Sequence, residues 1–149
     1  MKNSAYSPRW AGMIQRYHAT PTIRNQSVGE HTFQVMLAYV QEFGNPPPHV
    51  WFYMLYHDVA EIGTGDVPFL VKRRFPNLKL ELNKAEPEIL ADFGVPVMLL
   101  TEKEERRIKW ADLMEMKRFA LEELAMGNTY AQDIVFNIDE ALKLLGEVT

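Results

Sequence analysis

The feature that most constrains the fold is a pair of capping boxes, each of which marks the start of a helix. In a capping box, a Ser or Thr is followed three residues later by Glu. The first box begins residues 27–43, where apolar side chains recur three and four positions apart. The second begins a longer segment, which we expect to be helical from 101 to about 126. Strand signals are weak along the whole chain, so the sequence predicts an all-α fold.

Further helices are predicted between these two and at both ends of the chain. The run at 49–62 is apolar on nearly every side, which predicts a central helix. Asp66 is a candidate N-cap for another short helix, and the segment 75–85 is ambiguous. The other predicted helices cover residues 4–17, 87–93 and 129–145. No repeat or linker divides the chain, so we expect a single domain, residues 1–149, with six or seven helices.

The composition of the chain limits the cellular compartments and the classes of binding partner that we expect for it. The formal net charge is −4 and no large Lys/Arg cluster is present, which argues against a nucleic acid polymer as partner. The absence of cysteine excludes disulfides, thiolate nucleophiles and Cys-based zinc sites, and it fits a reducing compartment. The first residues lack the apolar core of a signal peptide, and the longest apolar run, 50–56, is too short to span a bilayer. We therefore expect a soluble, cytoplasmic protein with no membrane partner.

Ionisable residues follow this apolar run directly. His57 and Asp58 stand side by side, Glu61 follows three residues later, and Asp66 comes soon after. Residues three and four apart share one face of a helix, so Glu61 can converge on one patch with His57 and Asp58. These groups either form a hydrogen-bonded network in the core or bind something that offsets their desolvation.

Two more polar residues are predicted to face the core from other helices. His31 lies in the first turn of its helix above an apolar stripe, and Asp112 has apolar residues four before, four after and seven after it. An unpaired buried carboxylate costs several kcal/mol, so Asp112 requires a partner or a metal. Together with His57 and Asp58, these residues offer two imidazoles and two carboxylates, which suit Zn, Mn, Co or Fe. The pattern therefore indicates a metal site inside a helical bundle.

Each of these residues also has a purely structural explanation. A His-Asp pair is common in proteins, and Asp112 could be a buried acid bonded to Trp110 or to a helix N-terminus. His31 could face water from the first turn of its helix. These alternatives remain open on the sequence pattern alone.

The order of the motifs EH (30–31), YHDxxE (56–61), TGDxP (64–68) and AD (111–112) resembles the HD-domain metal-dependent phosphohydrolases. The likeness is strongest to the 5′-deoxynucleotidase branch, which is related to small HD-domain triphosphohydrolases of deoxynucleoside triphosphates. The matching stretches, 15–31, 55–72 and 109–116, thread through most of the chain. The resemblance implies a single-domain HD-type helical bundle.

The resemblance also implies roles for individual residues. The implied metal ligands are His31, His57, Asp58 and Asp112. The implied catalytic residues are Glu61, which would orient or deprotonate the attacking water, Arg16, which would hold the phosphate, and Asp66, which would contact a sugar hydroxyl or assist the leaving oxygen. The residues implied to line the substrate are Arg16, Tyr17, Asp66, Phe69, Leu70, Val71 and Lys72.

The chain departs from the family pattern at several positions. Relatives that prefer deoxyribose usually carry Trp where this chain has Tyr17, and a small polar residue is usual where Phe69 stands. Arg73 and Arg74 add positive charge beside Lys72. The two arginines either form a solvated face or contact additional phosphates of a triphosphate.

The activity implied by the resemblance is hydrolysis of the 5′-phosphate ester of 2′-deoxyribonucleotides, by default a monophosphate cleaved to deoxynucleoside and phosphate. The close alternative is a triphosphohydrolase that releases tripolyphosphate. A nucleotide-binding module without catalysis is a third possibility, although binding alone needs no carboxylate such as Glu61. The implied cofactor is a divalent ion (Co, Mn, Zn or Mg), with a second ion conceivable near Glu61 and Asp66. The resemblance also implies a homodimer.

Overall fold

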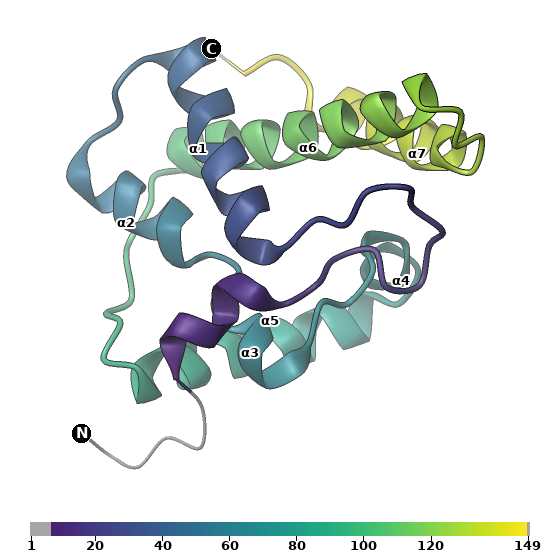
Figure 1. Ribbon diagram of the computed structural model, residues 1–149. Coiled ribbons are helices and arrows are strands. Elements are labelled where there is room, and N and C mark those ends of the chain that lie inside the picture. The colour runs from purple at the N-terminus through teal and green to yellow at the C-terminus, as the bar shows by residue number, and fades with distance from the viewer. Residues whose placement is uncertain (1–6, 149) are drawn as a thin grey trace.

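The structure, a computed structural model, describes residues 7–148, and these residues form seven α-helices and one short 3₁₀-helix (Figure 1). The 3₁₀-helix is η1 (Pro8–Met13), and the α-helices are α1 (Val28–Phe43), α2 (Pro48–Tyr56), α3 (Glu61–Thr64), α4 (Phe69–Arg74), α5 (Pro76–Asp92), α6 (Glu102–Ala125) and α7 (Ala131–Leu145). The prediction of an all-α fold with six or seven helices is confirmed. Among the described residues, no helix is long and apolar enough to cross a membrane.

Both predicted capping boxes begin helices. The hydroxyl of Ser27 accepts a hydrogen bond from the backbone N–H of Glu30 at 3.1 Å, which caps α1. At the start of α6 the box is reciprocal, because Thr101 accepts from the Glu104 backbone and the Glu104 carboxylate accepts from the Thr101 backbone. These bonds satisfy backbone donors that a helix N-terminus otherwise leaves without partners.

The core lies between α1, α2, α6 and α7. In Figure 1, α6 and α7 run side by side and α1 crosses α6. Where α1, α2 and α6 meet, Val35, Met54 and Ala111 are fully buried. The apolar stripe predicted for the last helix packs onto Leu113 and Met116 of α6. Helices α1 and α6, which carry His31 and Asp112, are therefore fixed by extensive burial.

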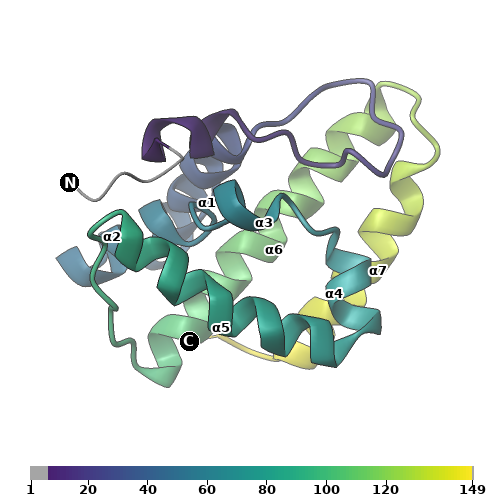
Figure 2. The ribbon, with the colours of Figure 1, turned by 90° about the horizontal axis from the view of Figure 1, so that it is seen from below.

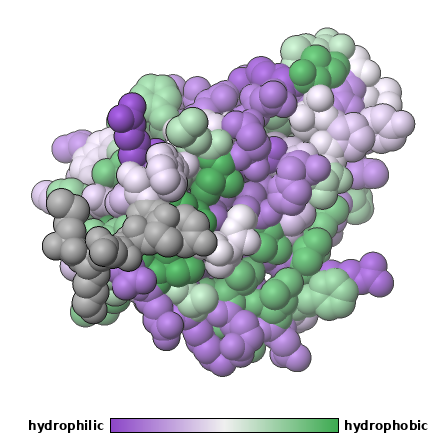
Figure 3. All heavy atoms as spheres, turned by 60° about the horizontal axis from the view of Figure 1, so that its bottom comes forward, coloured by the Kyte–Doolittle hydropathy of each residue, from purple (hydrophilic) through white to green (hydrophobic). Residues whose placement is uncertain are grey.

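Helices α3, α4 and α5 lie on the other side of the molecule and cover it less tightly (Figure 2). No residue of α4 or α5 is buried, although α5 turns a half-buried stripe inward. Figure 3, which brings this underside forward, shows green apolar surface running between purple hydrophilic side chains. The space between this layer and the core helices contains the candidate site.

Two helices are shorter than predicted, namely the one expected at 4–17 and the one expected at 49–62. Of the helix expected at 4–17, residues 4–6 lie outside the described part, and the rest is helical only over η1, followed by an extended segment in which Gln15 bridges to Ser27. The helix expected at 49–62 ends at Tyr56, and successive turns with bonds three residues apart lead into α3. It also buries only one face, because Phe52 and Leu55 are about half exposed.

Three local signals were also misread. Asp66 does not cap α4, whose N-cap is Pro68; the Asp66 carboxylate instead accepts a hydrogen bond from the Tyr17 backbone. Pro87 does not begin a helix, because α5 is one continuous helix from 76 to 92 with Pro87 inside it. The last helix, which is predicted to begin at residue 129, begins at Ala131 with Tyr130 as its N-cap. Proline is favoured in the first turn of a helix, so the sequence predicts a helix start at Pro87, but α5 contains this exposed proline in its interior.

Candidate metal centre and substrate pocket

Four predicted ligands meet from three parts of the chain. His31 comes from the first turn of α1, Asp112 from the middle of α6, and His57 and Asp58 from the turn after α2. His31 Nε2 lies 3.2 Å from Asp112 Oδ1 and 3.4 Å from Asp58 Oδ2, and His57 Nε2 lies 3.5 Å from the same Asp58 oxygen. These four side chains therefore lie close to one another where the three segments meet.

The turn after α2 presents His57 and Asp58 together. His57 Nδ1 lies 2.5 Å from the Met54 carbonyl, so this nitrogen donates to the backbone and Nε2 points toward Asp58. The next bonds join residues three apart, from Val59 to Tyr56 and from Glu61 to Asp58. Such tight turns replace the regular helical spacing, so neighbouring side chains can be directed at one place.

The residues present fit a divalent metal ion. Within residues 7–148, the Nε2 atoms of His31 and His57 are both buried without a hydrogen-bond partner. Ligand atoms of His31, His57 and Asp112 all lie within 4.8 Å of one another. Buried nitrogens without partners cost free energy, and a metal ion would use their lone pairs. Two imidazoles with two carboxylates are a donor set suited to a first-row transition metal.

The electrostatics of the cluster keep its carboxylates ionised. Burial alone would raise the pKa of Asp112, but Lys109 at 2.6 Å and the His31 imidazole hold that pKa well below its ordinary value. The pKa of Asp58 is lowered in the same way, because His57 and His31 outweigh the effect of burial. For His31, burial and Arg16 oppose protonation, yet the neighbouring carboxylates of Asp112 and Glu115 raise its pKa to about 9. A cation is therefore favoured at the point where these groups meet.

Glu61 lies beside this cluster, but its pKa is shifted in the opposite direction from those of Asp58 and Asp112. Burial, followed by the charges of Asp58 and Asp66, raises the pKa of Glu61 to about 8. Its Oε1 lies 3.8 Å from Lys72 Nζ, and its Oε2 is buried with no hydrogen-bond partner in the part of the chain that the structure describes. Glu61 is thus a carboxyl group poised to exchange a proton near neutral pH.

Arg16 approaches the cluster from the loop before α1. Its Nη1 donates to the Gln26 side chain at 3.0 Å and lies 3.5 Å from Glu115, while its Nε is buried and has no partner among residues 7–148. Tyr17, the next residue, has a backbone φ of +57°, which is uncommon for a residue other than glycine. Its ring stacks on Phe119 with centroids 4.7 Å apart.

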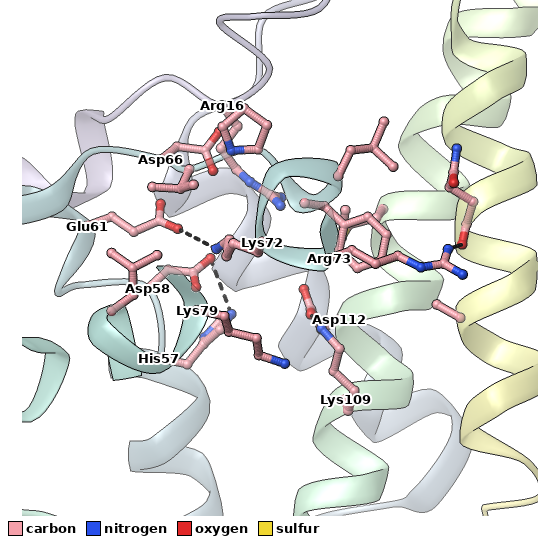
Figure 4. A pocket seen from close by; sticks show the side chains of 18 of the residues that line it. Arg16, His57, Asp58, Glu61, Asp66, Lys72, Arg73, Lys79, Lys109 and Asp112 are labelled. Atoms are coloured by element: carbon pink, nitrogen blue, oxygen red, sulfur yellow. Dashed lines mark hydrogen bonds and ion pairs between the residues drawn. The ribbon is translucent and has the colours of Figure 1, made fainter. Parts of the chain in front are cut away.

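Except for the fully buried His31, these groups border one cavity of about 760 Å³ (Figure 4). The close-up shows Arg16, Glu61, Lys72 and Asp112 directed into the same space from different segments. Most of the predicted substrate residues line it, namely Arg16, Tyr17, Asp66, Phe69, Leu70 and Lys72. Val71 is not among the lining residues, since the side chains of successive residues in a helix such as α4 point in different directions.

The sequence patterns missed several residues that hold this arrangement. Glu115 contacts His31 Nδ1, Gln26 bonds both Glu115 and Arg16, and Lys109 pairs with Asp112. Glu115 lies three residues after Asp112, so helical spacing could have placed it on the same inward face. Gln26 had no comparable signal, because its position depends on how the loop before α1 folds.

Known proteins resemble this chain over most of its length. The sequence model of the YfbR-like 5′-deoxynucleotidase family matches residues 9–147. A protein of Vibrio atlanticus named 5′-deoxynucleotidase is 30% identical over 168 aligned positions, which cover 96% of this chain and 87% of that protein. A Vibrio cholerae protein of the same name is 31% identical and covers 80% of this chain and 74% of its own. The 5′-deoxynucleotidase YfbR of Salmonella arizonae is 29% identical over 78% of this chain and 70% of its own.

Proposed function

Because this chain belongs to the YfbR-like 5′-deoxynucleotidase family, we propose that it is a metal-dependent enzyme that hydrolyses 2′-deoxyribonucleoside 5′-monophosphates to deoxynucleoside and phosphate. The observation that carries the proposal is the convergence of two unpartnered imidazole nitrogens and two carboxylates at the edge of a large cavity. A buried network without a ligand would leave both nitrogens unsatisfied.

In the proposed enzyme, His31, His57, Asp58 and Asp112 hold a divalent ion, with Co, Mn, Zn and Mg as the candidates. Such an ion acidifies water and withdraws charge from a phosphoryl group. The acidic pair Glu61 and Asp66 is the place where a second ion would bind. The low pKa values of Asp58 and Asp112 support these ligands, because both are ionised and ready to bind a cation.

Glu61 accepts the proton of the attacking water in this proposal. Its raised pKa, about 8 without a cation, suits a group that gains and loses a proton near neutral pH. Lys72 Nζ, 3.8 Å from its Oε1, stabilises the ionised form. Asp66, which lies next to Tyr17 through the backbone hydrogen bond, contacts a sugar hydroxyl or assists the leaving 5′ oxygen.

Arg16 binds the phosphate. Its Nη1 is engaged by Gln26, and its remaining N–H groups, including the unpartnered Nε, are left for phosphate oxygens. Tyr17 lies against the sugar, since its ring is held flat on Phe119 at the cavity wall. Phe69, Leu70 and Lys72 line the rest of the substrate, whereas Val71 is not among the residues that line the cavity.

A monophosphate is favoured over a triphosphate. The relatives described above are each named 5′-deoxynucleotidase. Of the two arginines considered for additional phosphates, Arg74 is not among the residues that line the cavity, and Arg73, which does line it, also bonds a backbone carbonyl. Arg73 donates to the Asn137 carbonyl at 3.4 Å, and the Arg74 guanidinium lies 5.8 Å from the centre of the Phe75 ring.

The proposal extends to organisation and location. Residues 1–149 constitute one HD-type domain, which works as a homodimer in the cytoplasm. The apolar stripe of α7 packs within the chain, so a dimer interface would use other apolar side chains, which the surface exposes. Helices α1 and α2 expose Phe33 and Phe52 by more than half, which supports an interface there. Light scattering on the purified protein tests the dimer.

The deciding experiment is a substrate panel. Deoxy- and ribonucleoside mono-, di- and triphosphates are incubated with the protein and Mn²⁺, Co²⁺, Zn²⁺ or Mg²⁺, and phosphate and tripolyphosphate are quantified separately. We expect phosphate release from deoxynucleoside monophosphates, and loss of it in Glu61→Ala with the metal still bound. Tripolyphosphate release, or an unchanged rate in Glu61→Ala, would contradict the proposal.

A further inference from the structure

Glu115 is a buried carboxylate of α6 that the proposed reaction does not use directly. We infer that Glu115 is a positioning residue, which fixes His31 for the metal and Arg16 for the phosphate through one carboxylate. The inference rests on the proposed function, because it concerns the same metal centre and the same phosphate-binding arginine.

The first observation is the contact between Glu115 and His31. Glu115 Oε2 lies in close hydrogen-bonding contact with His31 Nδ1, and the two side chains are only 4% and 0% exposed. A carboxylate accepts hydrogen bonds and cannot donate them, so it fixes the proton of His31 on Nδ1. When a metal ion displaces the proton of Nε2, the lone pair of this nitrogen would be directed toward Asp58 and Asp112, where the metal ion would bind.

The second observation is a closed set of hydrogen bonds around Arg16. Gln26 Nε2 donates to Glu115 Oε1 at 2.6 Å, and Gln26 Oε1 accepts from Arg16 Nη1 at 3.0 Å. Arg16 Nη1 also lies 3.5 Å from Glu115 Oε2. The backbone reinforces this set, because the Arg16 N–H donates to the Gln26 carbonyl at 2.9 Å. One end of the guanidinium is thereby held, and the other end is directed to the cavity.

Glu115 therefore connects the two halves of the site. Three donors from the loop before α1 and from α1 itself converge on its two oxygens, and all of them are largely buried. A carboxylate behind a metal-bound histidine orients the ring and raises its basicity as a ligand, and loss of such a partner typically weakens metal binding by about 10–100-fold. The same loss would release one end of Arg16.

Binding and kinetics separate this role from simple filling of the core. Mn²⁺ affinity is measured by competition with a chromophoric chelator, and KM and kcat are measured with a deoxynucleoside monophosphate. Glu115→Met keeps the length of the side chain but removes both oxygens, and we expect it to weaken Mn²⁺ binding by about 10–100-fold and to raise KM. Glu115→Gln keeps an acceptor without the charge, so a smaller loss of both is expected.

Two further variants locate the effect. Gln26→Leu removes a partner of Arg16 that does not touch His31, so KM should rise while the Mn²⁺ affinity is retained. Glu122→Gln, on the same helix, removes an exposed carboxylate that pairs with Arg24 at 2.6 Å, and it should change neither quantity. Thermal melts of all variants exclude loss of folding as the cause.

The outcomes distinguish the inference from the function on which it rests. If Glu115→Met and Glu115→Gln bind Mn²⁺ as tightly as the unmodified protein, the positioning role is wrong, even if phosphate release is observed. If the unmodified protein binds Mn²⁺ but releases no phosphate from any nucleotide, the proposed function is wrong. The Mn²⁺ affinities of the Glu115 variants still test the positioning of His31 in that case.

Discussion

The ionisation of Glu61 should make the stability of the metal-free protein depend on pH. Its side chain is about 10% exposed, and burial together with Asp58 and Asp66 raises its pKa from an ordinary 4.5 to about 8. The folded protein therefore retains a proton on Glu61 at pH values where the unfolded chain has lost it. A divalent cation at the site would reverse this, because its charge favours the ionised carboxylate.

The direction and the size of this change in stability with pH follow from proton linkage. Between pH 4.5 and 8 the folded state binds more protons at this position, so its stability falls as pH rises, by up to about 1.4 kcal/mol per pH unit. Over the whole interval the penalty reaches at most about 5 kcal/mol, and it stays constant above pH 8. His31, with a pKa raised to about 9, changes stability in the same direction but is present in every variant compared.

The assay compares the metal-free protein with Glu61→Gln by urea denaturation from pH 5 to pH 9. Glutamine keeps the shape of the protonated acid and cannot ionise. We expect the two proteins to differ little at pH 5, and the variant to become more stable by several kcal/mol at pH 8. A difference that stays constant over this range would refute the reasoning, because it would mean that Glu61 ionises normally in the folded protein.

Three other changes test separate parts of the site. Asp112→Asn should abolish the rise in melting temperature that Mn²⁺ gives the unmodified protein. That rise corresponds to a stabilisation of about 2.7 kcal/mol when the metal is at 100 times its Kd. An equal rise in the variant and in the unmodified protein would exclude Asp112 as a ligand. Arg16→Lys should raise KM by about 10-fold or more with a smaller effect on kcat, because an ammonium group cannot bond both Gln26 and the phosphate in a planar fork. Gly29→Ala should lower the free energy of unfolding in urea by about 1–2 kcal/mol, since its Cβ would lie 3.0 Å from the Gly12 carbonyl oxygen and force η1 away from α1.

Side-chain periodicity predicted the inward direction of two of the candidate metal ligands. His31 and Asp112 stand on apolar stripes of long, well-capped helices, and such helices are fixed by burial of the stripe. Their direction into the core could therefore be derived from spacing alone. The chemical roles proposed for these residues came from the resemblance to the family, because periodicity indicates direction and not chemistry.

The parts that sequence reasoning missed depend on contacts between distant segments. The helix was expected to continue past Tyr56, but the chain changes to tighter turns where His57 and Asp58 face other helices. Gln26 is positioned by its pairing with Arg16, ten residues earlier, and by a carboxylate 89 residues later. Local propensity has no information on such partners, and tertiary contacts decide these positions.

Helix α5 gives the cavity an outer wall that is also the easiest part to open. None of its residues is buried, whereas α6 buries eight, including Phe119 and Ala120. Pro87 has no N–H to bond the carbonyl of Asn83, and Asn83 lies on the turn that faces the cavity. Few buried contacts and a missing backbone bond are the marks of a segment that unfolds locally before the rest. Backbone amides of α5 should thus exchange with deuterium well before those of α6, and a nucleotide held beneath the helix would slow that exchange.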